Sequence, residues 1–202
     1  SGMEYFNTVS PQMRVYTGSA WQAASLNNLS SAVVQYTPEG TGAVVTTAQA
    51  KFRERISVKD FGAKGDGVTD DAVAIQAAVT ASVGKTLLFP AGTYIIGTTI
   101  SLPSSVRLLG EAGVSALKLK TQVWGAANGL MFSVSVKTKI QFEDLVLDGN
   151  KGNVGTTRSP LIVLFNSQRI LVLGCIFQNC EGICLNTSTN IDDIQVRNCQ
   201  FL

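Results

Sequence analysis

Histidine is absent from the 202-residue sequence, and cysteine and proline are scarce, with four and five residues. The missing histidine removes the side chain that most often activates a nucleophile near neutral pH and that shares many zinc sites with cysteine. No run of about 18 apolar residues occurs, so we expect no membrane-spanning segment. The N-terminus also lacks a charged segment followed by an apolar one, so the sequence predicts no signal peptide.

Charge of either sign is limited: 16 Lys and Arg residues and 14 Asp and Glu residues leave a formal net charge of +2. The basic residues are scattered and not clustered, which gives no reason to expect a nucleic-acid partner. Hydrophobic residues make up 45% of the chain, which is enough for a real core in one or two domains. Ser1 and Gly2 before Met3 resemble a remnant of tag removal, and they carry no weight in the fold prediction.

The four cysteines all lie in the last 30 residues, separated by 4, 3 and 14 residues: Cys175, Cys180, Cys184 and Cys199. Zinc sites usually combine two tight Cys-x2-Cys pairs, which this spacing lacks. A disulfide framework would spread its cysteines along a small secreted chain, and the sequence carries no export signal. We therefore expect four buried free thiols.

The first part of the chain alternates short apolar runs with turns. The segment "MRVYTGSAWQ" predicts a hairpin with its turn at Thr17–Ser19. Residues 37–47 carry proline, glycine and threonine, as a linker does, and Thr47 is a suitable N-cap for a short helix in "AQAKFRERI". After this helix, short β-branched runs separated by glycine, asparagine and serine dominate. We therefore expect a small β-module with a linker at 1–50 and a second domain at 51–202.

The stretch "SVKDFGAKGDGVTDDAVAIQAA" at 57–78 is dense in acids, lysines and glycines, as a ligand-binding loop would be. Its glycines at 62, 65 and 67 permit positive φ and tight turns. Thr69 is a natural N-cap, with Asp70 and Asp71 in the first turn of a helix expected at about 70–83. Each acid in the stretch therefore has a local structural role available.

Two ligand-binding motifs fail in the same region. A calcium loop that begins at Asp66 needs a glutamate at its twelfth position, which is Ala77 here. Gly84-Lys85-Thr86 resembles the end of a phosphate loop, but the position that requires the first glycine holds Val79. The Gly-Lys pair also ends a predicted helix instead of opening one, which is the wrong polarity for phosphate binding. The sequence predicts neither a metal site nor a cofactor site.

An internal repeat dominates the C-terminal part of the chain. The pattern apolar-x-apolar-x-x-apolar-x-apolar occurs three times, at spacings of 30 and 24 residues. Its apolar positions are Ile140, Phe142, Leu145 and Leu147, then Ile170, Val172, Cys175 and Phe177, then Ile194, Val196, Cys199 and Phe201. Each copy predicts two short strands joined by a two-residue bend. Repeats of this length, made of strands and corners, indicate a solenoid with parallel stacked strands, and we infer a parallel β-helix.

The second residue of each bend supports this interpretation. It is Asp144 in the first copy, Gly174 in the second and Asn198 in the third. Aspartate, glycine and asparagine are the residues that most readily adopt the left-handed conformation of a sharp corner. We expect all three to have positive φ and to stack along the helix axis, with the next residue of each copy pointing inward.

Four motifs in the middle of the chain resemble the opening of the pectate-lyase-like β-helix domain of bacteriophage tailspikes. They are "SVKDFGAKGDGVTDDAVAIQAAV", "LLFPAGTYII", "ISLPSSVRLLGE" and "LVLDGN", which occur in this order between residue 56 and about residue 150. The resemblance implies a mainly all-β chain, with a right-handed parallel β-helix preceded by a small N-terminal β-module and a short capping helix. Upstream, "YFNTVSPQMRVYTGSAWQ" is similar to the short β-module near the virion-attached end of many phage tail fibres.

The resemblance also implies a function. Tailspikes bind and often cut capsular or O-antigen polysaccharide, form homotrimers and belong to the virion tail, which is assembled in the host cytoplasm. By this resemblance the N-terminal region docks on other tail proteins, with Tyr16, Trp21 and Tyr36 packed between chains. The chain stops just after its third repeat, so we expect an N-terminal fragment whose missing C-terminal part binds the polysaccharide. No cofactor, metal, nucleic-acid or membrane partner is expected.

Cleavage of a polysaccharide by hydrolysis requires two carboxyl groups about 5 to 9 Å apart in a groove. The candidate acids are Asp144, Asp148, Glu181, Asp192 and Asp193. They lie at predicted corners and turns, where backbone needs explain acidic residues without catalysis, so the sequence assigns no catalytic residue. Three functions stay open for the parent protein: a depolymerase, a non-enzymatic tail fibre or adaptor, and a secreted pectin-degrading enzyme. The missing signal peptide weighs against the third.

Overall fold

The computed structural model divides into two compact units, Ser1–Arg53 and Glu54–Leu202, which we describe separately. The residues whose structure is described are 4–6, 13–16, 19, 21–23, 34–121, 130–152, 160–180 and 183–202. Within these ranges, no helix combines the length and the apolar composition that crossing a bilayer requires.

The N-terminal unit begins with short antiparallel strands. Strands β1 (Glu4–Phe6), β2 (Met13–Tyr16) and β3 (Trp21–Ala23) form one sheet in the order β1-β2-β3. The predicted hairpin is confirmed, because β2 pairs antiparallel with β3 and Tyr16 is the register partner of Trp21.

A second antiparallel pair follows, formed by β4 (Gln35–Tyr36) and β5 (Thr46–Thr47). The segment between them, predicted as a plain linker, is therefore the loop of a hairpin. Its proline and glycines serve the loop, while the β-branched threonines at its end pair with the preceding strand. Helix α1 (Ala48–Phe52) begins directly afterwards. The predicted N-cap is confirmed, because the Thr47 hydroxyl accepts a hydrogen bond from the Ala50 N–H at 3.1 Å.

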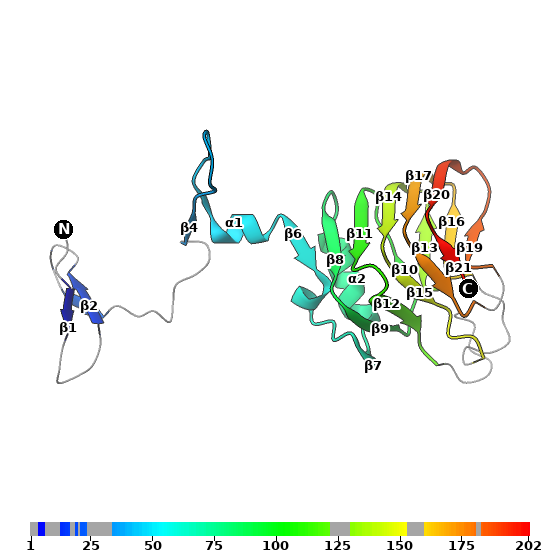
Figure 1. The fold of residues 1–202 in the computed structure, drawn as a ribbon, viewed down its shortest axis with the longest axis horizontal. Coiled ribbons are helices and arrows are strands. Elements are labelled where there is room, and N and C mark those ends of the chain that lie inside the picture. The colour runs from blue at the N-terminus through cyan, green and yellow to red at the C-terminus, as the bar shows by residue number, and fades with distance from the viewer. Residues whose placement is uncertain are drawn as a thin grey trace. The chain divides into compact units, whose positions relative to one another are not determined.

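The second unit is a parallel β-helix with three sheets (Figure 1). The first sheet contains β6 (Arg55–Ser57), β8 (Thr86–Phe89), β11 (Val106–Gly110), β14 (Thr138–Glu143), β17 (Gln168–Leu173) and β20 (Asp192–Arg197). The second contains β7 (Asp66–Asp70), β9 (Gly92–Ile96), β12 (Ser115–Leu119), β15 (Val146–Asp148), β18 (Ile176–Gln178) and β21 (Gln200–Phe201). The third contains β10 (Ile100–Ser101), β13 (Phe132–Ser135), β16 (Ile162–Phe165) and β19 (Leu185–Thr187). A short 3-10 helix, η2 (Val58–Phe61), connects β6 to the loop before β7.

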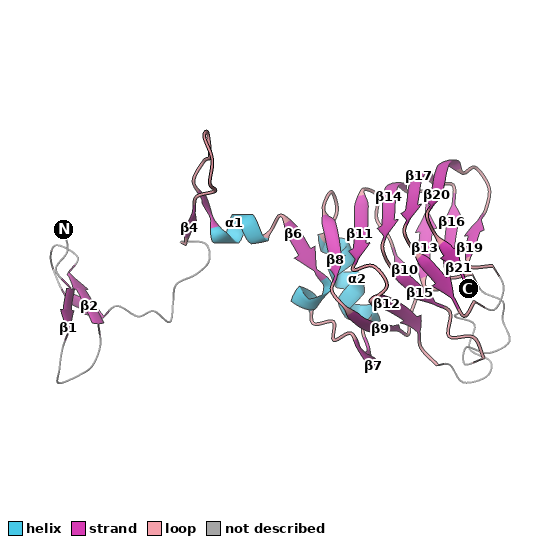
Figure 2. Ribbon diagram, in the orientation of Figure 1, coloured by secondary structure: helices cyan, strands magenta, loops and turns pink. Residues whose placement is uncertain are grey.

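Helix α2 (Ala72–Ala81) takes the place of a strand in the opening rung. From β8 to β19 the chain adds one strand to each sheet in turn, whereas the opening rung has β6, β7 and then α2, drawn in cyan beside the first strands in Figure 2. The Gln76 side-chain amide donates to the Ser101 carbonyl at 3.1 Å and accepts from the Ser101 N–H at 2.8 Å. A side chain thereby satisfies the edge of β10, which would otherwise stay open to another strand.

Helix α2 begins later than the sequence predicts. The expected helix at about 70–83 was to be capped by Thr69, but Asp71 occupies the N-cap position. Thr69 belongs to β7 instead, and its hydroxyl donates to the Asp66 carboxylate at 2.8 Å.

The physical reason for the later start is strand pairing. Asp70 is a register partner of Ile95 in β9, and the Asp71 N–H donates to the Ile95 carbonyl at 2.8 Å. These ladder bonds hold the chain extended until it has passed the second sheet. The glycines in the preceding turns behave as predicted, with φ of 93° at Gly62, 61° at Gly65 and 77° at Gly67.

Ladders of like residues from successive rungs form the core, and they confirm the predicted repeat. In the first sheet Leu87, Leu108, Phe142, Val172 and Val196 are register partners in turn. In the second sheet the series is Tyr94, Leu117, Leu147, Phe177 and Phe201. The Phe177 and Phe201 rings stack with their centroids 4.9 Å apart. Burying a large apolar side chain contributes about 1.5–3 kcal/mol, so each internal rung adds several such terms to the stability.

The predicted corner is confirmed at all three of its positions. Asp144, Gly174 and Asn198 have φ of 54°, 64° and 53°. A Cβ added to Gly174 would lie 2.3 Å from the Asp144 Oδ1, so these two corners are stacked in direct contact. The residue after the corner is fully buried as Leu145 and Cys175, and partly buried in the third copy.

The structure adds two columns of left-handed residues that the sequence did not predict. One column, which we call the entry column, lies at the start of the first-sheet strands. Its members are Gly84, Ser105, Lys139, Arg169 and Asp193, with φ of 74°, 60°, 60°, 56° and 53°. The other column includes Val136 and Asn166, which follow β13 and β16 with φ of 54° and 46°. Serine, lysine, arginine and valine have little preference for positive φ, so the four positions that they occupy carried no signal in the sequence.

The expectation of four free thiols is wrong for two of the cysteines. Cys180 and Cys184 form a disulfide, with Cα atoms 5.8 Å apart, while Cys175 and Cys199 are free. Both bonded cysteines lie in the single short connection between β18 and β19. The local return of the chain brings them together, so no framework of cysteines spread along the chain is needed.

Thiol titration should therefore find two free groups in protein denatured without reductant, and four after reduction. In the native protein Cys199 should react well before Cys175, because burial raises the pKa of the Cys175 thiol to about 12 and keeps it protonated. The variant Cys180→Ser is the control and should show three free groups without reductant. Four free groups in the unreduced parent chain would contradict the disulfide.

Replacing Val136 with asparagine should stabilise the second unit by about 1 kcal/mol, since a β-branched residue is strained at positive φ and asparagine is not. Val136 is 68% exposed, so the exchange loses little buried apolar surface. Val114→Asn is the matched control, because Val114 is 52% exposed and has no positive φ. Urea unfolding of both variants measures the effect. Equal stability of the two variants would show that the corner stores no strain.

Candidate functional site

The acids of the glycine-rich opening stretch serve the backbone. The Asp66 carboxylate accepts hydrogen bonds from the Val68 N–H at 2.9 Å, the Thr69 N–H at 2.8 Å and the Thr69 hydroxyl. These bonds, led by the one from the Thr69 N–H, lower the pKa of Asp66 to about 2. A carboxyl group held ionised in this way is unsuited to act as a general acid.

Asp70 and Asp71 connect separate segments. The buried Asp71 carboxylate accepts from the N–H groups of Lys64 and Gly65 at 2.6 and 2.9 Å. Asp70 accepts from the Gly97 N–H at 3.1 Å and from the Lys120 Nζ at 3.2 Å. Burial acts to raise the pKa of Asp70, but its hydrogen bonds and the lysine outweigh burial and lower it. Both acids are used fully in joining the opening rung to the next two.

Asp148 is the most buried of the predicted candidate acids, at 7% exposure. Its carboxylate accepts from the Asn150 N–H at 2.7 Å, the Gln178 Nε2 at 3.0 Å and the Asn179 Nδ2 at 3.1 Å. The bond to Asn150 is the predicted Asp-Gly-Asn turn, and the other two join this rung to the next one. Three donors satisfy the carboxylate, so its burial needs no catalytic explanation.

The other described candidate acids lie at a corner or at the start of a strand. Asp144 occupies its predicted corner, and Asp193 lies in the entry column, where its carboxylate accepts from the Gln195 side chain at 3.1 Å. Asp192 and Asp193, which the sequence places in a turn before a strand at Ile194, are instead the first two residues of β20. Glu181 lies outside the described residues. Within the described ranges no group of three or more acid or cysteine side chains is placed to hold a metal ion.

The register aligns the residues between the apolar ladder positions in rows, and one further row contains an acid that the sequence reasoning missed. Gln141, Leu171 and Gln195 are partners in the first sheet, and Val146, Ile176 and Gln200 are partners in the second. One step along the first sheet, Leu109 pairs with Glu143 and Glu143 with Leu173. Glu143 was overlooked because it directly precedes the corner, although alternation along β14 places it outward.

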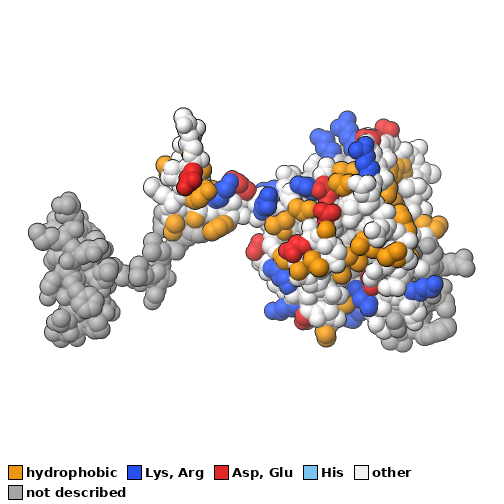
Figure 3. All heavy atoms as spheres, viewed as in Figure 1, with side chains coloured by type: hydrophobic (Ala, Val, Ile, Leu, Met, Phe, Trp, Pro, Cys, Tyr) orange, Lys and Arg blue, Asp and Glu red, His pale blue; other side chains and the backbone are white. Residues whose placement is uncertain are grey.

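Charged residues are unevenly distributed among the three sheets. The strands of the third sheet contain no charged residue. The strands of the first sheet carry five basic residues, which are Arg55, Arg107, Lys139, Arg169 and Arg197. Figure 3 shows Lys and Arg side chains gathered over the ends of β11, β14 and β17, with acidic side chains beside them.

A groove lies on this side of the first sheet, at the start of β8, β11 and β14. Its volume is about 390 Å³, and its lining residues are Glu54, Gly84, Lys85, Thr86, Ser105, Val106, Arg107, Lys139 and Gln141. Hydroxyl, amide and cationic groups dominate this lining. The groove therefore offers many hydrogen-bond donors and one carboxylate, which suits binding better than acid–base chemistry.

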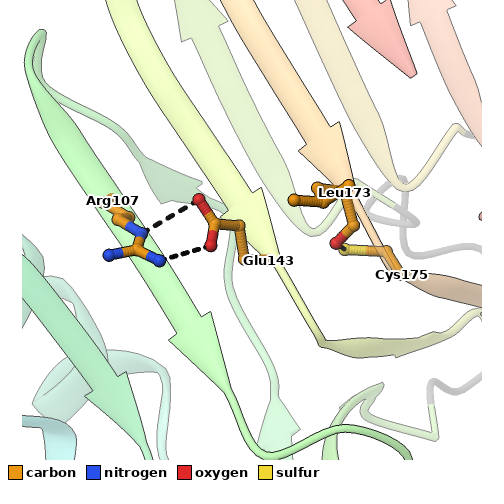
Figure 4. Close-up of polar contacts among 4 residues, drawn as sticks. All are labelled: Arg107, Glu143, Leu173 and Cys175. Carbon is orange, nitrogen blue, oxygen red and sulfur yellow. Dashed lines mark hydrogen bonds and ion pairs between the residues drawn. The ribbon is translucent and has the colours of Figure 1, made fainter. Parts of the chain in front are cut away.

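An ion pair beside the groove fixes one of these donors. The Arg107 Nε and Nη2 donate to the two carboxylate oxygens of Glu143 at 2.9 and 2.5 Å, as Figure 4 shows. The Glu143 side chain is 11% exposed and that of Arg107 is 41% exposed. The hydrogen bond to Glu143 raises the pKa of Arg107 above its already high ordinary value. Paired in this way, the Glu143 carboxylate accepts two charge-assisted bonds and is not available as a free catalytic acid.

A second groove, of about 440 Å³, lies on the second sheet. Its lining residues are Gly67, Val68, Thr93, Ile95, Lys118, Leu119, Lys120, Thr121 and Asn150. Lys120 is already paired with Asp70, and the Asn150 amide donates to the Leu119 carbonyl at 2.9 Å. Its polar groups are therefore largely engaged in joining rungs.

Comparison with known proteins finds the beginning of the β-helix unit similar to pectate-lyase-like proteins. Residues 55–141 match the family model described as "Rhamnogalacturonase A/epimerase, pectate lyase-like". The chain is 36% identical over 103 residues to the preneck appendage protein of Bacillus phage PZA and 37% identical over 98 residues to the tail spike protein of Shigella phage Sf6. It is also 37% identical over 102 residues to a probable glucan endo-1,3-beta-glucosidase of Arthroderma benhamiae.

These sequence matches involve parts of longer proteins. They cover 50%, 45% and 49% of this chain, but 12%, 16% and 10% of the three relatives. The predicted resemblance to phage tailspikes is thus confirmed for the beginning of the β-helix. The chain therefore spans between about a tenth and a sixth of the length of these relatives.

Solved structures confirm the fold class, a right-handed parallel β-helix. Tailspike protein 3 of bacteriophage CBA120 matches with a TM-score of 0.66 and 19% identity, over 89% of this chain and 31% of that protein. The tailspike of Escherichia coli bacteriophage HK620, a mutant in complex with a pentasaccharide, matches with 0.64 and 21%, over 85% and 34%. The A-module of the Azotobacter vinelandii mannuronan C-5 epimerase AlgE6 matches with 0.59 and 24%, over 71% and 43%.

Because the ionised Asp66 carboxylate accepts three hydrogen bonds, its removal should lower the stability of the chain in a pH-dependent way. The pKa of Asp66 in the folded chain, about 2, lies below the ordinary value of 3.8. Its stabilising contribution is therefore fully present above pH 3.8 and is lost as the pH falls from 3.8 to about 2. Asp66→Ala should have a lower Tm than the parent at pH 7, and the difference should close near pH 2.

The control for this measurement is Glu111→Ala, which removes an exposed acid whose carboxylate accepts no hydrogen bond from a described residue. Its Tm should follow that of the parent chain at every pH. A Tm difference between Asp66→Ala and the parent that stays constant from pH 7 to pH 2 would show that the ionised carboxylate does not stabilise the fold.

Proposed function

We propose that this chain is the virion-proximal part of a phage tailspike or tail appendage protein. In the whole protein, the N-terminal unit attaches to the tail, and the β-helix binds and depolymerises a bacterial surface polysaccharide. The extent of the structural matches carries this proposal. The two tailspikes match 89% and 85% of the chain, whereas Glu54–Leu202 holds about three quarters of it. The tailspike matches therefore include part of the N-terminal unit. The epimerase match covers 71% of the chain, which the β-helix unit alone can account for.

We assign tail attachment to this chain and cleavage to the rest of the protein, and the described acids support this division of labour. Asp66, Asp70, Asp71 and Asp148 are each satisfied by backbone or amide donors, and Glu143 is paired with an arginine. Glycoside hydrolysis needs two carboxyl groups facing one groove, one of them protonated. The first rungs supply a rigid start for the solenoid, so the proposed cleavage belongs to residues beyond this chain.

The N-terminal unit is proposed to form a homotrimer and to dock on other tail proteins. Helix α1 has no buried residue, and apolar side chains around it are exposed: Val44 by 77%, Val45 by 53%, Phe52 by 73% and Tyr36 by 41%. A small β-module with so little burial gains stability from packing between chains. The side chains of Tyr16 and Trp21, predicted to share this role, lie outside the described part of the structure.

Two other functions are compatible with particular observations. A rigid, non-enzymatic fibre or adaptor fits the described rungs equally well, because hydrogen-bond donors satisfy their buried acids Asp71, Glu143 and Asp148. A secreted pectin-degrading enzyme, the third function, fits the match to the rhamnogalacturonase family model. The tailspike proposal is preferred because it also accounts for the N-terminal part of the chain.

The full-length protein should cleave the capsule or lipopolysaccharide of its own host, and the 202-residue chain should not. Reducing ends report hydrolysis and unsaturated uronates report elimination, while light scattering on the same samples reports the trimer. Cleavage by the 202-residue chain alone would contradict the division of labour. If the full-length trimer binds the host surface but releases no fragments, the protein is the non-enzymatic fibre.

A further inference from the structure

We propose that the groove at the start of β8, β11 and β14 binds the acidic group of a charged glycan. The groove lies in the first rungs, outside the part of the protein to which we assign cleavage. That the ligand is a glycan rests on the proposed function, whereas its charge is inferred from the groove itself. Three cationic side chains, Lys85, Arg107 and Lys139, line a volume of about 390 Å³.

The two lysines keep their charge uncompensated. Neither Lys85 nor Lys139 forms an ion pair with an acid in the described ranges, whereas Lys120 on the second sheet is paired with Asp70. Glu54 is the acid among the groove's lining residues, and the Glu143 carboxylate is taken up by Arg107. An anion that enters the groove therefore meets two ammonium groups without displacing an existing partner.

Arg107 is oriented in advance for an anion. Its Nε and Nη2 are held by Glu143, and Figure 4 shows the remaining guanidinium nitrogen turned away from that carboxylate. Two N–H donors on this nitrogen stay available for a ligand oxygen. Because the ion pair already restricts the arginine side chain, binding a ligand costs less conformational entropy than it would with a freely rotating arginine.

The entry column fixes the two lysines on a rigid backbone. Lys139 is a member of this column, and Lys85 directly follows its first member, Gly84. The Gly84 N–H donates to the Ser105 carbonyl at 2.6 Å, and the Ser105 N–H donates to the Thr138 carbonyl at 2.9 Å. The lysines thus lie two rungs apart on the same side of the sheet, with β11, the strand of Arg107, between them.

The size and polarity of the groove fit a short piece of glycan. Sites for small molecules have volumes of about 300–1,000 Å³, and this groove lies near the lower limit, with room for about one or two sugar units. Thr86, Ser105 and Gln141 supply the hydroxyl and amide groups that sugar hydroxyls require. Nucleic acid fits less well, because the chain has a net charge of only +2 and its three groove cations would neutralise few phosphates.

The test is titration calorimetry on the 202-residue chain with size-matched oligosaccharides. We expect a uronic-acid tetrasaccharide to bind and its neutral counterpart, maltotetraose, not to bind. A sulfated tetrasaccharide distinguishes a requirement for carboxylate from one for negative charge alone, and binding of either acidic form supports the proposal. Affinity should fall as the salt concentration rises, since exposed charges are screened beyond about 8 Å at physiological ionic strength.

A double variant locates the binding. Lys85→Gln with Lys139→Asn should weaken the acidic tetrasaccharide about tenfold, which corresponds to 1.4 kcal/mol. Asparagine tolerates the positive φ of position 139. The matched control is Lys64→Gln with Lys151→Gln, which removes the same charge from exposed lysines that do not line the groove. If the double variant fails to fold, Lys85→Gln alone should still weaken binding about threefold.

Three results would overturn the inference: no binding of either acidic tetrasaccharide, equal binding of the neutral one, or equal weakening by the groove and control variants. Each differs from a failure of the proposed function. A full-length protein that acts on a neutral host polysaccharide would retain that function without this site. A chain that binds acidic tetrasaccharides through Lys85 and Lys139 would retain the site even if the full-length protein recognised no bacterial surface.

Discussion

Every rung of this β-helix must bend its backbone at the same places as the rungs on either side. Parallel ladders leave no alternative, because a corner out of step would unpair the N–H and C=O groups of both neighbours. The cost is borne by residues with positive φ, such as Asp144, Gly174 and Asn198. Once the corners are in step, the inward ladders of apolar residues follow, since each strand is carried to the same depth in every rung.

The same constraint explains why acids are frequent at the corners and at the junctions between rungs. Corners and rung junctions expose backbone N–H groups that need acceptors, and short carboxylates reach them. Asp66, Asp70, Asp71 and Asp148 all serve such groups. The cations that line the proposed glycan groove lie where the ladders need no acceptor. Arg107 occupies an outward first-sheet position, and Lys85 and Lys139 lie beside it.

The fold could be predicted from the sequence because two independent signals mark the repeat. One is the spacing of its apolar residues, and the other is the type of residue at each corner. The apolar pattern alone predicts the register partners of Ile140 and Phe142, and the residue type alone predicts the left-handed corner at Asp144. The entry column could not be foreseen, since Lys139 and Arg169 adopt positive φ through ladder pairing and against their own preference. The disulfide was missed for a related reason: it depends on how the chain returns between β18 and β19, which no local pattern records. The groove escaped notice because its cations come from three separate strands or turns.

The Gln76 side chain closes one edge of the third sheet. By bonding to both polar groups of Ser101, it closes the one edge at which another strand could join β10 from the side of the opening rung. The third sheet is then extended only on its other side, from β13 to β16 and β19. A solenoid whose opening rung ends on a side chain in this way can gain or lose whole turns in its interior while that end keeps the same contacts.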